Sequence, residues 1–471
     1  MSDRLGVVGV VPFWSNSDNL NADSCYVWLR TVLPEISRHE PDTHFCVFFP
    51  DPNYGRDKWV YHPDGLVSDK IHLISWPYDS SMAGGVVGFD SVRHRTVETS
   101  FGINLYWLIM VEMGTMLAGG YGNAYSSDGK PAIVSQHQYV IHDSLPYPAE
   151  SLFSRLWLQL GGSIASDRLV YASQHCYDMA QDSFSRYVTP EVMESLNRRS
   201  QVLLFGLLSG DEPRSPKASG KKRPIMLYNH RFELYKQPHK TWEVYKTLRQ
   251  QGYQFDIWVT QALGQKTKEY PAEHLIHAPE RDDYLRQIAS VCAINTINST
   301  HETYCISAVD SMAVGHLVVL PNAITFPELV PQDYPYLFSD EEQQTKMLAY
   351  ILSTWPREYN KWGPVLSEYV RTKFNLKSYV EQYAPVLHAA EDSHRQAIKK
   401  RTTYKALEHI FGKMPKGMPF PLWGKNGLSA TFNQIGKLGP QAFPVARIVR
   451  EAAKRDDIDI IWQDTIKLVR R

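Results

Sequence analysis

Short apolar runs alternate with amphipathic segments along most of the chain. Residues 5–11 and 44–49 are apolar runs of strand length, and residues 26–36 between them have the spacing of an amphipathic helix. A second strand, helix and strand follow within residues 131–172. Strands that alternate with helices in this way predict a parallel sheet covered by helices.

The same rhythm starts again after a polar interruption. Residues 210–224 are rich in Pro, Ser, Gly and Lys, lack apolar periodicity, and predict a linker. After them, residues 225–228 predict a strand, residues 239–251 a helix and residues 255–260 a further strand, and a buried strand is expected at 318–320. The pattern therefore predicts two Rossmann-like α/β domains with a ligand cleft between the carboxyl ends of their strands.

The expected domain boundaries follow from this division. We expect an N-terminal domain over residues 1–209, completed by helices that return over residues 356–393. The C-terminal α/β domain would span residues 224–355, and residues 400–471 would form a third, smaller domain.

Composition adds limits to this picture. The 471 residues are 43% hydrophobic, which is enough for several complete cores. No apolar run of membrane-spanning length occurs, and the N-terminus lacks the features of a signal peptide, so we expect a soluble cytoplasmic protein with no membrane partner. The five cysteines are scattered without C-x-x-C pairs, which argues against a disulfide framework or a structural zinc site.

Two cations follow the first strand of the second domain. That strand continues into NHRFELYKQP, which places Arg231 and Lys236 five residues apart before a helix. Arginine can fork onto two phosphate oxygens and lysine adds a compact charge, so the pair suits a diphosphate. Taken alone, the two residues could equally be solvated loop cations.

Two carboxylates occur at a defined spacing in the stretch HETYCISAVD. Glu302 and Asp310 are separated by seven residues, and a helix is expected to begin within 303–307 and to continue to about Val314. Backbone N–H groups at a helix start bind anions. With one acid before the helix and one inside it, a bound nucleotide diphosphate sugar would explain both: Glu302 would accept hydroxyls of the sugar and Asp310 those of the ribose.

These residues resemble a known family. HETYCISAVDSMAVGHLVVLP is similar to the E-x(7)-E segment of retaining glycosyltransferases of family four, and HRFELYK is similar to their R-x(4)-K diphosphate loop. The resemblance implies the GT-B architecture, with Glu302 on the donor sugar, Asp310 on the ribose, and Arg231 and Lys236 on the diphosphate. It also implies phosphate contacts from the backbone amides of Thr303, Tyr304, Cys305 and Ile306. The second acid is Asp instead of Glu, and Cys305 stands where the family usually has glycine.

The first domain would face the acceptor. His137 follows a predicted strand, and in similar glycosyltransferases a histidine at this point lies over the donor sugar, so His137 is the catalytic candidate and His142 the alternative. A structural histidine is equally compatible with the sequence. IASDRLVYAS resembles the family's strand that ends in Ser before a helix, which implies that Ser173 lines the cleft. Phe13 or Trp14, in the loop after the first strand, would stack on a sugar ring unless this is an ordinary loop.

We expect no metal and no cofactor beyond the donor substrate. The D-x-D motif typical of metal-dependent transfer occurs only as Asp457 and Asp459, far from the donor residues. The departing diphosphate would instead be stabilised by Arg231, Lys236 and the helix start.

The end of the chain is basic. Residues 394–471 contain 16 lysines and arginines against six aspartates and glutamates. Helices are expected at 404–411, at 429–437 and from Pro444, followed by a hairpin over 458–469, which is the order of a winged helix. The expected DNA contacts are Arg447, Arg450, Lys454, Arg470 and Arg471. The alternatives are a solvated basic appendage or an oligomerisation element.

A donor site joined to a DNA-binding module resembles, in arrangement, phage glycosyltransferases that decorate hydroxymethylated pyrimidines. The hypothesis is transfer of a sugar from UDP-glucose to 5-hydroxymethylcytosine in DNA with retention of configuration, in the host cytoplasm if the protein is phage-encoded. The base would have to leave the stack to present its hydroxymethyl group. The alternatives are a glycosyltransferase acting on tRNA, a lipid or a polysaccharide, and a DNA-binding regulator with an inactive transferase domain.

Overall fold

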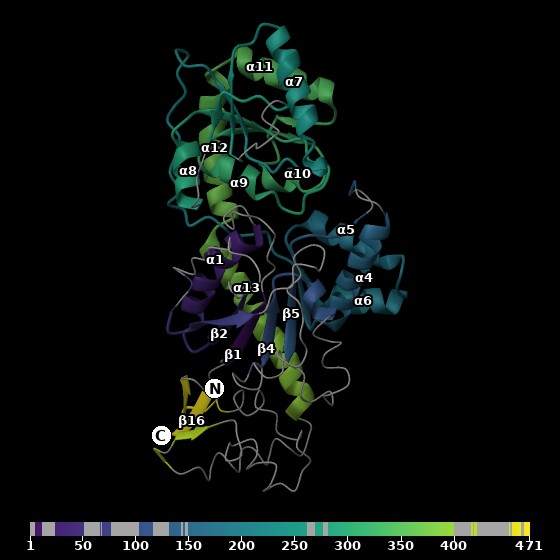
Figure 1. Cartoon of the computed structure of the whole chain (residues 1–471), viewed down its shortest axis with the longest axis vertical. Coiled ribbons are helices and arrows are strands. Elements are labelled where there is room, and N and C mark those ends of the chain that lie inside the picture. Colours follow the sequence, from purple (N-terminus) through teal and green to yellow (C-terminus); the bar gives the residue numbers. More distant parts are fainter. Residues whose placement is uncertain are drawn as a thin grey trace.

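The computed structural model, shown in Figure 1, contains two parallel sheets with their helices and a small antiparallel sheet. The structure describes residues 5–11, 24–50, 66, 68–76, 103–115, 131–142, 145–146, 149–260, 269–276, 281–399, 416–417, 419–421, 452, 455–462 and 466–471.

The first domain has a seven-stranded sheet in the order β3-β2-β1-β4-β5-β6-β7, in which every pairing is parallel. β1, β4 and β5 are buried along their whole length, because helices cover both faces of a parallel sheet. Its strands are β1 (Val7–Val11), β2 (His44–Pro50), β3 (Ile71–Trp76), β4 (Leu105–Leu108), β5 (Ala132–His137), β6 (Arg168–Tyr171) and β7 (Ser200–Val202). Its helices are α1 (Ser24–His39), α4 (Ala149–Ala165), α5 (Gln174–Ser185) and α6 (Pro190–Arg199).

The second domain has a six-stranded parallel sheet in the order β10-β9-β8-β11-β12-β13. Its strands are β8 (Ile225–Tyr228), β9 (Asp256–Val259), β10 (His274–Leu275), β11 (Ala293–Thr296), β12 (Leu317–Pro321) and β13 (Leu337–Phe338). Its helices are η2 (Leu234–Lys236), α7 (Pro238–Gln250), α8 (Arg281–Ala289), α9 (Ile306–Ala313), α10 (Phe326–Leu329) and α11 (Glu341–Ser353). The predicted class, two α/β domains with parallel sheets, is confirmed.

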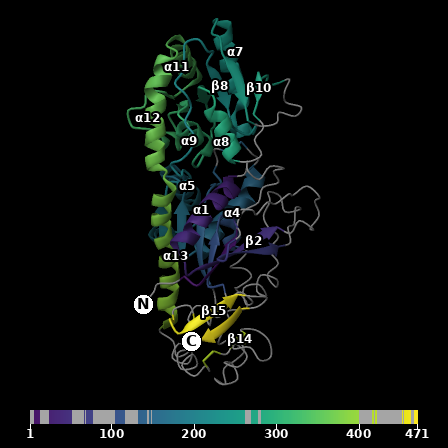
Figure 2. The same ribbon diagram turned by 90° about the vertical axis from the view of Figure 1, so that its left-hand side faces the viewer.

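Two long helices connect the domains after the second sheet. α12 (Arg357–Lys373) packs on α9 and β12, whereas α13 (Leu376–Lys399) packs on α1, β4, β5 and β6. Figure 2 shows them following one another along one side of the molecule, α12 beside the second domain and α13 beside the first. In the core of the first domain, the indole of Trp107 donates to the Tyr383 hydroxyl at 2.8 Å, which fixes α13 to β4.

The predicted linker at 210–224 is bound to the second domain. The Arg371 guanidinium of α12 donates to the backbone oxygens of Gly210 and Glu212, and the Ser215 hydroxyl donates to the carbonyl of Val314 at 2.8 Å. These hydrogen bonds hold the linker against the second domain.

The basic tail contributes a three-stranded antiparallel sheet in the order β14-β16-β15. The predicted hairpin is confirmed as β15 (Ile458–Trp462) and β16 (Ile466–Arg470), and β14 (Pro419–Pro421) is an edge strand that the pattern did not predict. The three predicted helices lie outside the described residues, apart from Ala452. None of the helices in the described part of the chain combines the length and apolar character needed to cross a membrane.

Candidate donor-binding site

The loop after β8 holds the two predicted cations. β8 ends at Tyr228, the chain passes through residues 229–233, and the single turn of η2 ends at Lys236 before α7 begins at Pro238. Arg231 donates through Nη2 to the Tyr235 hydroxyl at 3.0 Å. The loop thus carries both cations at the carboxyl end of β8, where parallel sheets build ligand sites.

The start of α9 lies against this loop. Glu302 is in the segment between β11 and α9, and its carboxylate accepts a hydrogen bond from the Lys236 ammonium. Cys305 directly precedes the helix with φ 69° and ψ 72°, the left-handed conformation for which glycine is the usual residue. The amides of Ala308 and Val309 donate to the Cys305 carbonyl at 3.1 and 3.4 Å, and the amides of Ile306 and Ser307 precede them at the helix start, where backbone N–H groups favour anions.

The Lys236–Glu302 pair keeps the lysine charged. Both side chains are about nine-tenths buried, at 11% and 10% exposed. Burial alone would lower the pKa of Lys236, but the Glu302 carboxylate outweighs it and raises the pKa above its usual value. The pair therefore presents a buried, permanently positive ammonium beside the helix start.

Asp310 is held by an arginine that the sequence did not single out. Arg281, the first residue of α8, donates from its two terminal nitrogens to the two carboxylate oxygens of Asp310 at 2.8 and 2.6 Å. The two side chains are 17% and 3% exposed, and the neighbouring carboxylate raises the pKa of Arg281 against the effect of burial. A ribose hydroxyl that reached Asp310 would share this carboxylate with Arg281.

A buried amide network fixes α9 to the sheet. The Asn229 amide nitrogen donates to the Ser307 carbonyl at 2.9 Å and to the Ser311 hydroxyl at 3.1 Å. The Asn295 amide nitrogen, on β11, donates to the Asn229 side-chain oxygen at 2.9 Å. These hydrogen bonds tie β11, the loop after β8 and α9 together, and the Asn295 side-chain oxygen has no hydrogen-bond partner within the described residues.

The first domain meets the site across the junction of the two domains. The Thr303 hydroxyl donates to the Gln138 carbonyl, and the Tyr304 hydroxyl donates to the Phe205 carbonyl at 2.6 Å. His301 packs with its ring centroid 5.2 Å from that of Tyr139 in the first domain. Burial, then Lys236, lower the pKa of His301 to about 3, so its imidazole is neutral.

The structure places His137 in the core of the first domain. Its ring is fully buried, stacks on Tyr171 at 4.4 Å, and contacts the Ser163 hydroxyl at 3.0 Å. It lies between β5, β6 and α4, which is the environment of a structural histidine. His142, the alternative, lies nearer the surface, with Nε2 3.0 Å from the Asp182 carboxylate.

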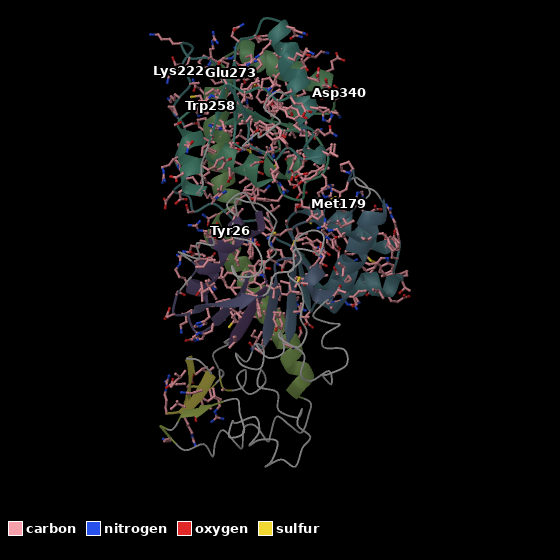
Figure 3. All side chains as sticks on the ribbon, viewed as in Figure 1. Tyr26, Met179, Lys222, Trp258, Glu273 and Asp340 are labelled. Carbon is pink, nitrogen blue, oxygen red and sulfur yellow. The ribbon has the colours of Figure 1, made fainter. Side chains whose placement is uncertain are left out.

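Ser173 caps α5. Its hydroxyl accepts from the Cys176 amide at 2.9 Å, and the side chain is fully buried. The next two amides, of Gln174 and His175, donate to the Glu328 carboxylate of the second domain at 2.9 and 2.8 Å. α5 and α1, which carry the labelled Met179 and Tyr26, lie at the end of the first domain that faces the second (Figures 1 and 3).

Several predicted residues lie outside the described part of the chain: Phe13, Trp14, Arg447, Arg450 and Lys454. Arg470 and Arg471 are described, and they form ion pairs with Asp457 and Asp459 respectively. The D-x-D pair in the tail is thus already bound to arginines. A hydrogen bond from Arg455 lowers the pKa of Asp457, and one from Arg471 lowers the pKa of Asp459.

Three site residues escaped the sequence analysis: His230, Arg281 and His301. His230 and His301 directly precede Arg231 and Glu302, so adjacency to the motif could have indicated them. Arg281 lies 29 residues before its partner, and no local pattern links the two.

No model of a known protein family matches the sequence. The structure is similar to sucrose-phosphate synthase from Thermosynechococcus elongatus, with 12% identity over 84% of this chain and 100% of that one and a TM-score of 0.60. It is also similar to a trehalose-6-phosphate structure from E. coli bound with UDP-2-fluoro glucose (11% identity, 81% and 99% covered, TM-score 0.54). A third is WaaG, a glycosyltransferase involved in lipopolysaccharide biosynthesis (14%, 81% and 99%, 0.52). At such identities the likeness concerns the fold, and the chain has the GT-B fold.

Proposed function

We propose that this protein is a retaining glycosyltransferase that uses a nucleotide diphosphate sugar, most simply UDP-glucose. The observation that carries the proposal is the meeting of Lys236, Glu302 and the start of α9 at one point of the domain junction. The similar structure from E. coli holds UDP-2-fluoro glucose, a donor of this class.

Each residue of the site has its own role in the proposed reaction. When the donor binds, the Lys236 ammonium moves its hydrogen bond from Glu302 to the diphosphate, and the amides at the start of α9 bind the diphosphate oxygens. Glu302, released from the lysine, accepts hydrogen bonds from the sugar hydroxyls. When the bond from the anomeric carbon to the diphosphate oxygen breaks, Lys236, Arg231 and the helix start stabilise the charge that develops there. The acceptor hydroxyl oxygen bonds to the anomeric carbon and passes its proton to the departing diphosphate oxygen, giving glycoside and nucleoside diphosphate.

For the acceptor, we propose the hydroxymethyl group of 5-hydroxymethylcytosine in DNA. The support is the basic tail and its topology. β14 lies in sequence between the first two predicted helices and pairs with β16, so the segment that holds the second and third predicted helices starts and ends in one sheet. A hairpin that follows a basic helix in sequence is the order of elements in a winged helix, whose helix enters a DNA groove.

The test is transfer of labelled sugar from UDP-glucose to duplex DNA with and without 5-hydroxymethylcytosine. We expect label only on the modified duplex, and loss of transfer in Glu302→Ala. A matched control is Glu368→Ala, which removes an exposed carboxylate on α12 that pairs with Arg214. Label on another acceptor but not on modified DNA would overturn the DNA acceptor and leave the donor assignment in place.

A saccharide or lipid acceptor is the second candidate, favoured by an aromatic surface. Phe153, Trp157 and Tyr187 are 41–50% exposed, and their ring centroids lie 5.6–6.1 Å apart. Such rings stack on sugars or enter the polar edge of a lipid layer. Transfer to a glycan or glycolipid that is lost in Trp157→Ala, with UDP release from the donor unchanged, would favour this acceptor over DNA. If no nucleotide sugar is hydrolysed or transferred, the protein is instead a regulator with an inactive domain.

A further inference from the structure

Three different metal-binding side chains converge inside the donor site. The imidazole of His230, the carboxylate of Glu302 and the thiol of Cys305 each offer an atom, and these atoms lie within 4.8 Å of one another. They come from the loop after β8 and from the segment before α9. All three residues are buried, at 6–8% exposed, so the cluster is not a surface patch.

The chemistry of the three groups suits one class of cation. Imidazole, thiolate and carboxylate together are ligands of zinc, whereas magnesium and calcium prefer oxygen alone. Ligand atoms around a tetrahedral zinc ion lie about 3.5 Å apart, given bonds of about 2.0–2.3 Å, so side-chain rotations that bring the atoms closer by about an ångström complete the geometry.

The charged groups that face the cluster are Lys236 and Arg231. The Lys236 ammonium is bonded to the Glu302 carboxylate, and the Ser307 hydroxyl lies 3.0 Å from Nδ1 of His230. A cation at this site must therefore displace the contact between Lys236 and Glu302.

We propose that His230, Glu302 and Cys305 form a binding site for a zinc-class divalent cation, and that this cation and the donor exclude each other. On binding, sulfur, one imidazole nitrogen and one carboxylate oxygen bond to the ion, and the thiol proton passes to the solvent. Lys236 gives up its contact with Glu302 and remains protonated. The fourth position is left to water.

The exclusion follows from shared groups and rests on the proposed function. Glu302 cannot hold both the cation and the sugar hydroxyls, and Cys305 stands directly before the amides that would bind phosphate. The site depends on Cys305 occupying the place where the resembled family has glycine, so it is a property of this sequence.

The binding test uses the full-length protein, stripped with a chelator, and cobalt(II) as a spectroscopic probe. We expect one tightly bound ion with a thiolate-to-cobalt charge-transfer band, displaced by one equivalent of zinc. Cys305→Ser should abolish the band and weaken zinc binding at least about a hundredfold, since even lost second-sphere partners cost about 10–100-fold. Cys292→Ser, which alters a half-buried cysteine on another element, is the matched control and should change neither.

A second variant and a donor titration complete the test. Cys305→Gly should also lose the band, and its thermal unfolding shows whether the loss reflects misfolding. In the unaltered protein, zinc should raise the apparent Kd for UDP-glucose in proportion to its concentration. Absence of the cobalt band, or equal zinc affinity in Cys305→Ser, overturns the site. A normal band with no UDP-glucose binding at any zinc level overturns the proposed function and leaves the metal site standing.

Discussion

Cys305 has a backbone conformation that residues other than glycine rarely adopt. Its φ of 69° places it in the left-handed region, which costs an ordinary residue about 1–2 kcal/mol. The cost is sustained because the Asn229 network fixes both the helix start and the loop beside it.

The strain at Cys305 predicts that glycine is more stable than alanine at this position, the reverse of their usual order in a helix. Cys305→Gly should be more stable than Cys305→Ala by about 1 kcal/mol, because both remove the thiol but only glycine relieves the backbone. Urea unfolding of the two variants measures the difference. Ala349→Gly in α11 is the control and should show the usual loss of about 1 kcal/mol. A more stable alanine variant at 305 would contradict the strain.

His137 is buried as a neutral imidazole, which makes the free energy of unfolding depend on pH. Burial lowers its pKa to about 3 in the folded protein, whereas the unfolded value is about 6.5. Between these values the unfolded chain binds a proton that the folded protein excludes, so stability falls as the pH falls, by about 1.4 kcal/mol per pH unit for this histidine.

His137→Phe should remove that contribution while keeping a ring against Tyr171. Urea unfolding between about pH 4 and 6 should show a flatter dependence than in the unaltered protein, by about the slope of one proton. Tyr171→Phe keeps the histidine and should leave the slope unchanged. An unaltered slope in His137→Phe would show that this histidine is protonated in the folded state.

At the scale of elements, α8 and α9 are joined by one buried ion pair. Removing one partner of such a pair leaves an uncompensated buried charge, which costs about 3–5 kcal/mol. The ion pair therefore couples the stability of the donor site to a helix that the motif does not include.

We expect Arg281→Gln to lower the free energy of unfolding by about 3 kcal/mol or more. Arg286→Gln, on the same helix, breaks an exposed pair with Asp283 and should cost less than about 1 kcal/mol. Denaturant unfolding of both variants gives the comparison. Equal effects would mean that Asp310 is neutral in the folded protein and does not need its arginine.

At the scale of the whole molecule, the basic tail can be removed from the chain without removing α13. α13 covers the first sheet through contacts such as Trp107–Tyr383, whereas the described strands of the tail form a sheet of their own. A chain ending after Lys399 keeps α13 and loses the basic segment.

This truncated chain should retain hydrolysis of UDP-glucose but bind DNA more weakly and with less dependence on salt, because fewer phosphate contacts remain. Fluorescence anisotropy over a salt series measures the change. A chain ending after Lys373 also loses α13 and should fail to fold, which marks the boundary. Unchanged DNA affinity in the first truncation would refute a nucleic-acid role for the tail.

Much of the fold and the core of the candidate site could be predicted because they depend on local order. Apolar runs of strand length, separated by helical periodicity, predicted both parallel sheets, and residues 458–469 predicted the hairpin. Arg231, Lys236 and Glu302 were singled out by their positions after a predicted strand and before a predicted helix, together with the resemblance to glycosyltransferases of family four, and the structure brings Lys236 and Glu302 together.

The tertiary structure decided the contacts that the spacing of residues along the chain does not indicate. The alternation of strands and helices predicts that His137 lies at the end of a strand. Only its packing against Tyr171 and α4 shows that its ring points into the core. Arg281 reaches Asp310 because the fold brings the start of α8 to α9, a contact that no local pattern indicates. The sequence by itself determined which chemical groups stand at the ends of the strands. The side chain that each group meets was decided by the fold, because contacts between distant segments depend on packing and not on periodicity.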